Sequence, residues 1–337
     1  MTIDRRHAAF GLGSSLVLAG CAIARPSAPV IVNLAEAAAE PEGLDAAADI
    51  ARRMTVPVRI NGSGPYSFVV DTGANRSVIG LEVAGALDLP RAGRAPIHGI
   101  AGVEPAETVS VASLAVGELN SRRLRLPMLP KARLGVDGLL GVDVLRDREV
   151  TLDFEQDRLR IDASGRGVKA VRGVANSRLR DSAPDDMVIV PARFRFGQLI
   201  IVDADVGGLP VTAFLDSGSQ NTVANRALQR AVAGRLPDLA AQKTVVRMIS
   251  ATGQTASGEL SPLPGLRLGG LRIGRLSAVF ADLHIFDVWD LKEQPALLIG
   301  IDVMRHFRSI RIDFGRRQVV FHVPAGTSLP PPPPPPR

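Results

Sequence analysis

The sequence is poor in cysteine and in the polar aromatic residues. Its 337 residues include one cysteine, one tryptophan and one tyrosine. A single cysteine cannot form an intramolecular disulfide, so the fold must rely on its core. Apolar residues make up 46% of the chain, which is enough to fill full cores. This length and composition fit one or two globular domains.

Several chemistries lack their sequence motifs. The chain has no His-Glu-x-x-His, no paired-cysteine motif, no G-x-S-x-G and no P-loop. Its five histidines are scattered without the spacing of metal ligands, so we expect no metal site. The formal net charge is +6, with no dense block of lysine and arginine and no interleaved aromatic residues. We therefore expect no nucleic-acid partner.

The N-terminus has the pattern of a targeting segment. Two arginines precede an apolar stretch over residues 8–18, which is too short to span a bilayer permanently. Leu18-Ala-Gly-Cys21 resembles a bacterial lipobox, which would place cleavage before Cys21 and a lipid on its sulfur. We therefore expect an exported, periplasmic lipoprotein anchored to the membrane. Two alternatives stay open, namely a twin-arginine signal and cleavage after residues 22–24 to give a plain periplasmic protein.

One short pattern occurs twice in the chain. It reads Phe68-Val-Val-Asp71-Thr-Gly-Ala74 and again Ala213-Phe-Leu-Asp216-Ser-Gly-Ser219. In each copy, an apolar run typical of a buried strand leads to an aspartate, a small hydroxyl residue and a glycine. Glycine lets the backbone turn sharply and approach another backbone closely. A buried, ionised carboxylate is costly unless it is paired or hydrogen-bonded, so the two carboxyls are expected to be each other's partners.

The surroundings of the pattern repeat in the same order, about 145 residues apart. Hairpin-like segments precede each aspartate, and two further pairs of apolar landmarks and one pair of hairpins follow it. A period of this length is too long for a solenoid and predicts a duplicated domain. The paired segments are residues 56–68 and 200–212, 114–119 and 266–271, 138–145 and 297–304, and 152–154 and 312–314.

These motifs resemble the retropepsin-like aspartic proteases, in the form of two fused lobes that bacteria encode as single chains. The resemblance covers roughly residues 55–323. It implies an all-β fold of two homologous acid-protease barrel lobes from an internal duplication, with one active site between them. The expected division is an export signal over 1–20, a lipidated cysteine and flexible tether over 21–54, a first lobe over 55–163, an interlobe linker over 164–186, a second lobe over 187–323 and a proline-rich tail over 324–337.

The resemblance also implies roles for individual residues. Asp71 and Asp216 would be the catalytic pair. The residues that follow them would support the two loops, because the hydroxyls would hydrogen-bond across to the opposite loop and the glycines would let the loops approach. These residues are Thr72, Gly73, Ser217 and Gly218. Two glycine-containing segments would be flaps that close over a bound peptide, with plain surface hairpins as the alternative. The flap residues are Gly99, Ile100, Ala101 and Gly102 in the first lobe and Ala251, Thr252 and Gly253 in the second.

A mechanism follows from the expected pair. Two carboxyls about 3 Å apart cannot both ionise, so they share one proton. A water held between them would be activated by the ionised carboxyl, while the protonated one polarises a peptide carbonyl, with no cofactor and no covalent intermediate. We predict an exported aspartic endopeptidase that acts on peptide or protein substrates. The alternative is a non-catalytic peptide-binding or structural envelope lipoprotein, which would need neither aspartate.

Three other features call for simpler interpretations. Asp143 and Asp302 each precede a short helix-like run, so we expect first-turn carboxylates rather than catalytic groups. Residues 281–294 have no evident counterpart in the first half and are expected to be an insertion, either a plain loop or a specificity loop. The seven prolines of residues 330–336 predict an exposed polyproline II tail.

Overall fold

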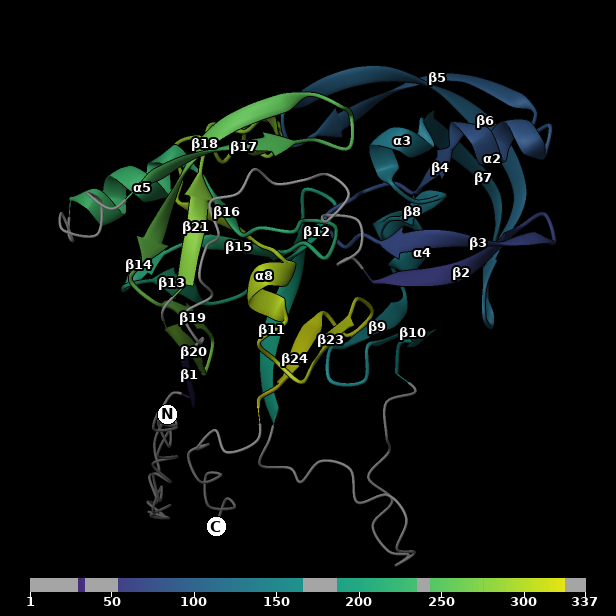
Figure 1. Ribbon diagram of the computed structural model, residues 1–337. Coiled ribbons are helices and arrows are strands. Elements are labelled where there is room, and N and C mark those ends of the chain that lie inside the picture. Colours follow the sequence, from purple (N-terminus) through teal and green to yellow (C-terminus); the bar gives the residue numbers. More distant parts are fainter. Residues whose placement is uncertain (1–29, 34–53, 166–186, 235–242, 275, 325–337) are drawn as a thin grey trace, which may run out of the picture.

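The computed structural model describes residues 30–33, 54–165, 187–234, 243–274 and 276–324. These residues form two β-rich lobes that lie side by side and are joined at one end (Figure 1). The export signal with Cys21, most of the tether, most of the linker and the proline tail lie outside the described residues. None of the helices in the described part of the chain has both the length and the apolar character needed to cross a membrane.

The first lobe is a sheet that closes on itself. Its strand order is β2-β3-β8-β4-β7-β6-β5, and β2 also pairs with β6, so that six strands form a closed barrel. The strands are β2 (Thr55–Ile60), β3 (Ser63–Val70), β4 (Val78–Gly80), β5 (Arg91–Gly99), β6 (Gly102–Val116), β7 (Leu119–Leu129) and β8 (Gly138–Leu140). Short helices connect them, namely α2 (Leu81–Ala86), α3 (Lys131–Leu134) and α4 (Val142–Leu145).

The apolar pattern of the sequence explains these strands. In β2, buried and exposed residues alternate, because one face of the strand packs on the core and the other faces solvent. The end of β3 is different, since Phe68, Val69 and Val70 are all buried. Phe68 and Val70 pack in the main core, whereas Val69 packs in a separate cluster on the other face of the strand. A strand covered on both faces reads as a continuous apolar run, as it does here.

The second lobe repeats the topology of the first. Its order β15-β22-β16-β21-β18-β17 matches β3-β8-β4-β7-β6-β5, and the parallel pairs β15–β22 and β16–β21 match β3–β8 and β4–β7. This confirms the predicted all-β fold with an internal duplication. The strands of this part of the sheet are β11 (Met187–Arg195), β12 (Gln198–Ile201), β15 (Thr212–Leu215), β16 (Val223–Ala224), β17 (Thr244–Ile249), β18 (Thr255–Leu263), β21 (Leu276–Phe280) and β22 (Ala296–Ile299).

A small five-stranded sheet completes the second lobe. Its order is β1-β20-β19-β13-β14, and the N-terminal strand pairs with β20 in parallel. Its strands are β1 (Val30–Asn33), β13 (Ala204–Val206), β14 (Leu209–Pro210), β19 (Leu266–Leu268) and β20 (Leu271–Gly274). The helices of this lobe are α5 (Arg226–Ala233), α7 (His284–Val288) and α8 (Ile301–Met304).

The expectation that residues 281–294 lack a counterpart was wrong. This segment contains α7 and connects β21 to β22, whereas α3 connects the equivalent strands β7 and β8 in the first lobe. The second connection is therefore a longer version of the first. Repetition in the sequence missed it because the two connections differ in both length and residue type.

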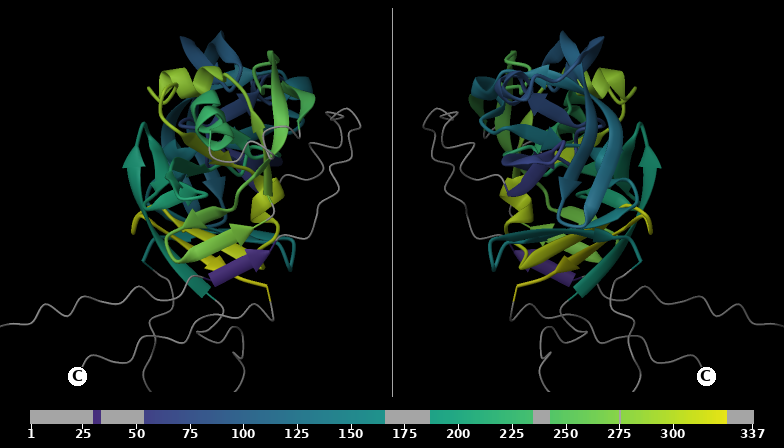
Figure 2. Two further views of the ribbon diagram at one scale, coloured as in Figure 1. Left: turned by 90° about the vertical axis from the view of Figure 1, so that its left-hand side faces the viewer. Right: turned by 90° about the vertical axis from the view of Figure 1, so that its right-hand side faces the viewer.

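One sheet joins the lobes at the base of the molecule, on the side away from β5 and β17 (Figure 2). Its order is β10-β9-β23-β24-β11, and the antiparallel pair β9–β23 crosses from one lobe to the other. In that pair Glu149 lies opposite Asp313, and the two buried carboxyls are hydrogen-bonded to each other. The remaining strands are β9 (Arg148–Asp153), β10 (Arg158–Ala163), β23 (Ser309–Asp313) and β24 (Gln318–His322).

Candidate active site

Each conserved-looking repeat of the sequence places its aspartate at the end of a buried strand. β3 ends one residue before Asp71, and β15 ends one residue before Asp216. Each aspartate N–H donates to a carbonyl of the neighbouring parallel strand, at 2.9 Å in both lobes. The backbone then leaves the sheet in a loop. We call residues 71–77 the first aspartate loop and residues 216–222 the second aspartate loop.

The hydroxyl residues tie the two aspartate loops together. Thr72 N–H donates to Ser217 Oγ at 3.1 Å, and Ser217 N–H donates to Thr72 Oγ1 at 3.0 Å. Each hydroxyl also donates across the lobes at 2.7 Å, Thr72 to the Leu215 carbonyl and Ser217 to the Val70 carbonyl. Both side chains are at least 97% buried, with 3% and 2% of their surface exposed. This double exchange fixes the loops in one mutual position, because losing either partner would leave buried backbone groups unsatisfied.

The glycines allow each loop to pack against the opposite carboxyl. A side-chain carbon built on Gly73 would lie 2.6 Å from Asp216 Oδ2, and one built on Gly218 would lie 2.6 Å from Asp71 Oδ1. Both distances are far below an ordinary carbon–oxygen contact. Glycine is therefore required here for space rather than for an unusual backbone angle.

Asp71 and Asp216 meet at the centre of this arrangement. Their carboxyls are hydrogen-bonded to each other, and each accepts the N–H of the glycine two residues on at 3.0 Å. Burial, and then the charge of the Asp71 carboxyl, raises the pKa of Asp216 to about 8. Because two neighbouring carboxyls cannot readily both be charged, the pair holds a shared proton over a wide range of pH. One protonated and one ionised carboxyl form a general acid and a general base in a single site.

Comparisons with known proteins agree with this geometry. A family model described as aspartyl protease matches residues 56–144 and 202–303, which together are more than half of the chain. The chain belongs to this family. A search of curated proteins gave no match.

Solved structures of related proteases were also found. The aspartic proteinase from Irpex lacteus is 13% identical, with 81% of this chain and 94% of that one covered and a TM-score of 0.44. A retropepsin-like aspartic protease from Rickettsia conorii is 16% identical, with 41% of this chain and 90% of that one covered and a TM-score of 0.29.

The aspartyl protease braces each aspartate loop with a second carboxyl that the sequence interpretation had left to the helices. Asp143 Oδ1 accepts the N–H and the hydroxyl of Ser77, at 2.9 and 2.7 Å. Asp302 accepts the same two groups from Thr222, at 2.9 and 2.8 Å. Both carboxylates do lie in the first turn of a short helix, as expected, but they also fix the far end of each aspartate loop. The signal was present in the sequence, since a hydroxyl residue stands six positions after each aspartate.

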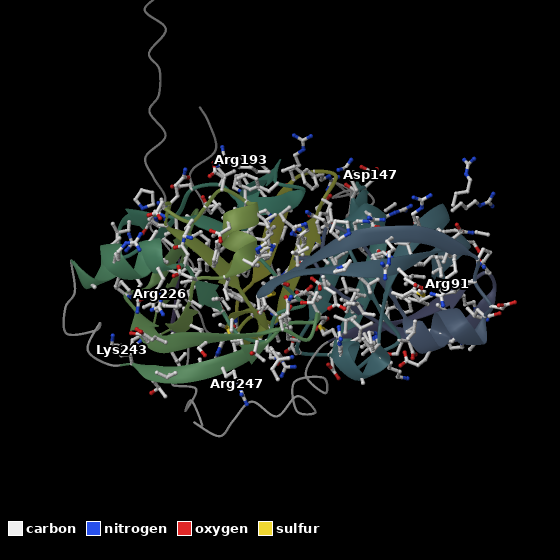
Figure 3. All side chains as sticks on the ribbon, turned by 90° about the horizontal axis from the view of Figure 1, so that it is seen from above. Arg91, Asp147, Arg193, Arg226, Lys243 and Arg247 are labelled. Atoms are coloured by element: carbon white, nitrogen blue, oxygen red, sulfur yellow. The ribbon has the colours of Figure 1, made fainter. Side chains whose placement is uncertain are left out.

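The predicted flaps are hairpins that meet above the aspartates. The first is β5 and β6 with its tip at residues 100–101, and the second is β17 and β18 with its tip at residues 250–254. Seen from above, they come from opposite sides of the molecule, with Arg91 at the start of β5 and Lys243 just before β17 (Figure 3). Four of the predicted flap residues line the cavity beneath, namely Gly99, Ile100, Ala251 and Thr252. Ala101, Gly102 and Gly253 belong to the same tips but are not part of that lining.

Side-chain contacts hold the two flaps against each other. Gln254 Nε2 donates to the Val103 carbonyl at 3.2 Å. Arg133, on α3, forms an ion pair with Glu104 at 2.8 Å and donates to the Thr252 carbonyl at 3.0 Å, so it contacts both hairpins. In the structure the flaps therefore cover the cavity, and a ligand as large as a peptide requires them to separate.

The cavity between the lobes has a volume of about 440 Å³ and contains both aspartates. Its walls are mostly apolar. Val78, Leu129 and Leu139 come from the first lobe, and Val223, Ile285 and Trp289 come from the second. Trp289, the only tryptophan of the chain, stacks on Phe214 with ring centroids 4.5 Å apart. The contribution of α7 to this wall was not predicted as such, since the sequence left a plain loop and a specificity loop both open. In the described part of the chain, no group of three potential metal ligands is found.

Proposed function

We propose that the protein is an aspartic endopeptidase in which Asp71 and Asp216 act together on one water molecule. The observation that carries the proposal is the hydrogen-bonded pair of carboxyls, one from each lobe, at the floor of a covered cavity. The ionised carboxyl takes a proton from the water, and the protonated carboxyl donates a hydrogen bond to the carbonyl of the scissile peptide. The family membership supports a protease, and the mostly apolar walls offer room for the side chains of an extended peptide.

The test is cleavage of a mixed peptide library between pH 3 and pH 7, with wild type beside Asp71→Asn and Asp216→Asn. We expect wild type to cut and both variants to lose at least about 10³-fold in rate, because each removes one half of an acid–base pair. Both substitutions are nearly isosteric, so the variants should fold. Variants that cut as fast as wild type would show that the activity does not depend on this pair.

The same experiment separates the protease from a non-catalytic binding protein. Trp289 lies in the cavity wall and is the only tryptophan, so its fluorescence reports a ligand that enters the cavity. Peptides that change the fluorescence of wild type but are recovered intact would support binding without hydrolysis. Peptides that bind Asp71→Asn and are cut only by wild type would support the protease.

We also propose that the protein is exported and anchored through a lipid on Cys21. The support is the lipobox-like sequence at residues 18–21 and the arginine-led apolar segment before it. Labelled palmitate should enter wild type but not Cys21→Ser, and only wild type should sediment with membranes. A mature N-terminus after residue 24 and no label in wild type would favour a plain periplasmic protein instead.

A further inference from the structure

The two halves of the active site are related by duplication, but one contact breaks their equivalence. Gln198, at the start of β12 in the second lobe, donates from its side-chain amide to the Gly73 carbonyl in the first aspartate loop at 2.8 Å. Only 2% of the surface of Gln198 is exposed. A buried amide that reaches across the lobes to a glycine two residues from a reactive carboxyl is a specific contact, since an unpaired buried amide would be costly.

The hairpin turn before Gln198 holds it in place. β11 and β12 are joined by two residues, Phe196 and Gly197, which both have positive φ, at 56° and 80°. Two left-handed residues define the tight turn that suits a two-residue hairpin, but phenylalanine rarely adopts this conformation. Phe196 is held there by packing on the apolar cluster of the second lobe and by the Arg195 guanidinium, 4.4 Å from its ring centre.

The same turn grips the first aspartate loop at Asn75. Asn75 Nδ2 donates to the Phe196 carbonyl at 3.1 Å, and Asn75 Oδ1 accepts from the Gln198 amide. A side-chain carbon on Gly197 would lie 2.7 Å from Asn75 Oδ1, so the turn fits the loop closely. Strained backbone that is retained against a reactive loop is a recurrent sign of a functional constraint.

The second aspartate loop has no matching clasp. Within the part of the chain that the structure describes, no side chain donates to the Gly218 carbonyl, although Gly218 occupies the position of Gly73 and both glycines line the cavity. The first loop is therefore held by an amide from the other lobe, whereas the second is held only by contacts that both loops share. The Gly218 carbonyl is left for a bound ligand, and the Gly73 carbonyl is already occupied.

We propose that Gln198 is a positioning residue that fixes the first aspartate loop and makes the two carboxyls of the pair inequivalent. This inference rests on the proposed protease function. A symmetric pair has no preferred member to hold the shared proton and no preferred direction for an extended peptide. A donor on one loop alone supplies such a preference, because it changes the position and the hydrogen bonding of one half of the site.

The test uses three substitutions at or near this contact. Gln198→Met keeps the shape of the side chain and removes the donor. Gln198→Glu offers a donor only when its carboxyl is protonated. Asn75→Ala removes the second grip from an exposed position, so it should fold even if a variant at Gln198 does not. The control is Gln156→Met, the same chemical change at an exposed turn in the base of the molecule.

For Gln198→Met we expect kcat to fall about tenfold, the equivalent of one buried hydrogen bond, with KM changed less than about twofold. Asn75→Ala should fall in the same direction by less, and the control should match wild type. Gln198→Glu should approach wild-type activity only at the acid end of its profile and lose activity as the new carboxylate ionises. All rates are normalised to the folded fraction from a parallel melting curve.

The outcomes separate this inference from the protease proposal. If wild type cuts but Gln198→Met and Gln198→Glu have its kcat and its pH profile, the clasp only stabilises the fold and the inference is wrong. If Gln198→Met does not fold, an unchanged kcat in Asn75→Ala overturns it. If wild type itself cuts no peptide under conditions where its cavity binds one by Trp289 fluorescence, the protease proposal fails and takes this inference with it.

Discussion

Replacing Gly73 by alanine should separate the carboxyl pair while leaving the fold intact. The added methyl would lie 2.6 Å from Asp216 Oδ2, and an ordinary contact needs about 3.5 Å, so the carboxyl must retreat by about 1 Å. The φ of Gly73 lies outside the left-handed region, so alanine meets no backbone strain there. A displacement of about 1 Å at a reacting group lowers kcat/KM by roughly 100-fold, and overpacking of this kind costs about 1–3 kcal/mol of stability.

The assay is kcat/KM for one peptide identified from the library, with the unfolding midpoint in urea measured alongside. Gly218→Ala is the symmetric variant and should behave in the same way, because its methyl would meet Asp71 at the same distance. Gly85→Ala is the control. Gly85 lies in α2 with open space around it, so alanine there should leave activity unchanged and raise stability by about 0.5–1 kcal/mol. If Gly73→Ala keeps activity within twofold of wild type, the carboxyls are not packed against the opposite glycines and the reasoning is wrong.

Three further predictions concern stability. Thr72→Val should lower the free energy of unfolding by about 2–4 kcal/mol in urea titrations, because it strands two buried backbone partners, while Ser63→Ala on the exposed end of β3 should have no effect; equal midpoints would contradict the cross-lobe exchange. Burial raises the pKa of Glu149, so its proton is retained on folding and the free energy of unfolding falls as pH rises above the unfolded-state value of about 4.5; Glu149→Gln should remove that part of the pH dependence, and parallel melting curves for the two proteins between pH 4 and pH 7 would refute it. The pKa of Asp216, raised to about 8, has the same sign, so Asp216→Asn should melt above wild type at pH 7 and near it at pH 3.5, and a lower melting temperature at pH 7 would count against a shared proton.

The sequence was sufficient to predict the halves of the site but not how they are held. Asp71 and Asp216 were identified because the same local pattern, strand then turn, occurs twice, and local patterns are what a single sequence records well. The exchange between Thr72 and Ser217 followed from the family resemblance. Both predicted hairpins with flap tips are present, and their tips lie over the cavity.

Contacts between distant segments were not predictable. Nothing in the sequence around Gln198 marks it as different from other glutamines, since its role depends on where the β11–β12 turn meets the other lobe. The pairing of β9 with β23, and so of Glu149 with Asp313, likewise depends on how two complete lobes dock. The wall formed by α7 was obscured for another reason. Its apolar residues, such as Phe286 and Trp289, resemble ordinary core residues, and only the arrangement of the lobes shows that some of them face a cavity.

The β9–β23 pairing within one chain also determines how the active site depends on protein concentration. An aspartate pair built from two separate subunits exists only to the extent that the subunits associate, and it is lost on dilution. Here both aspartates belong to one polypeptide, and the strands that join the lobes are covalently connected through residues 154–308. The effective concentration of one half relative to the other is set by the chain and does not change with the amount of protein. The rate per molecule should therefore stay constant down to the most dilute solution in which cleavage can be detected.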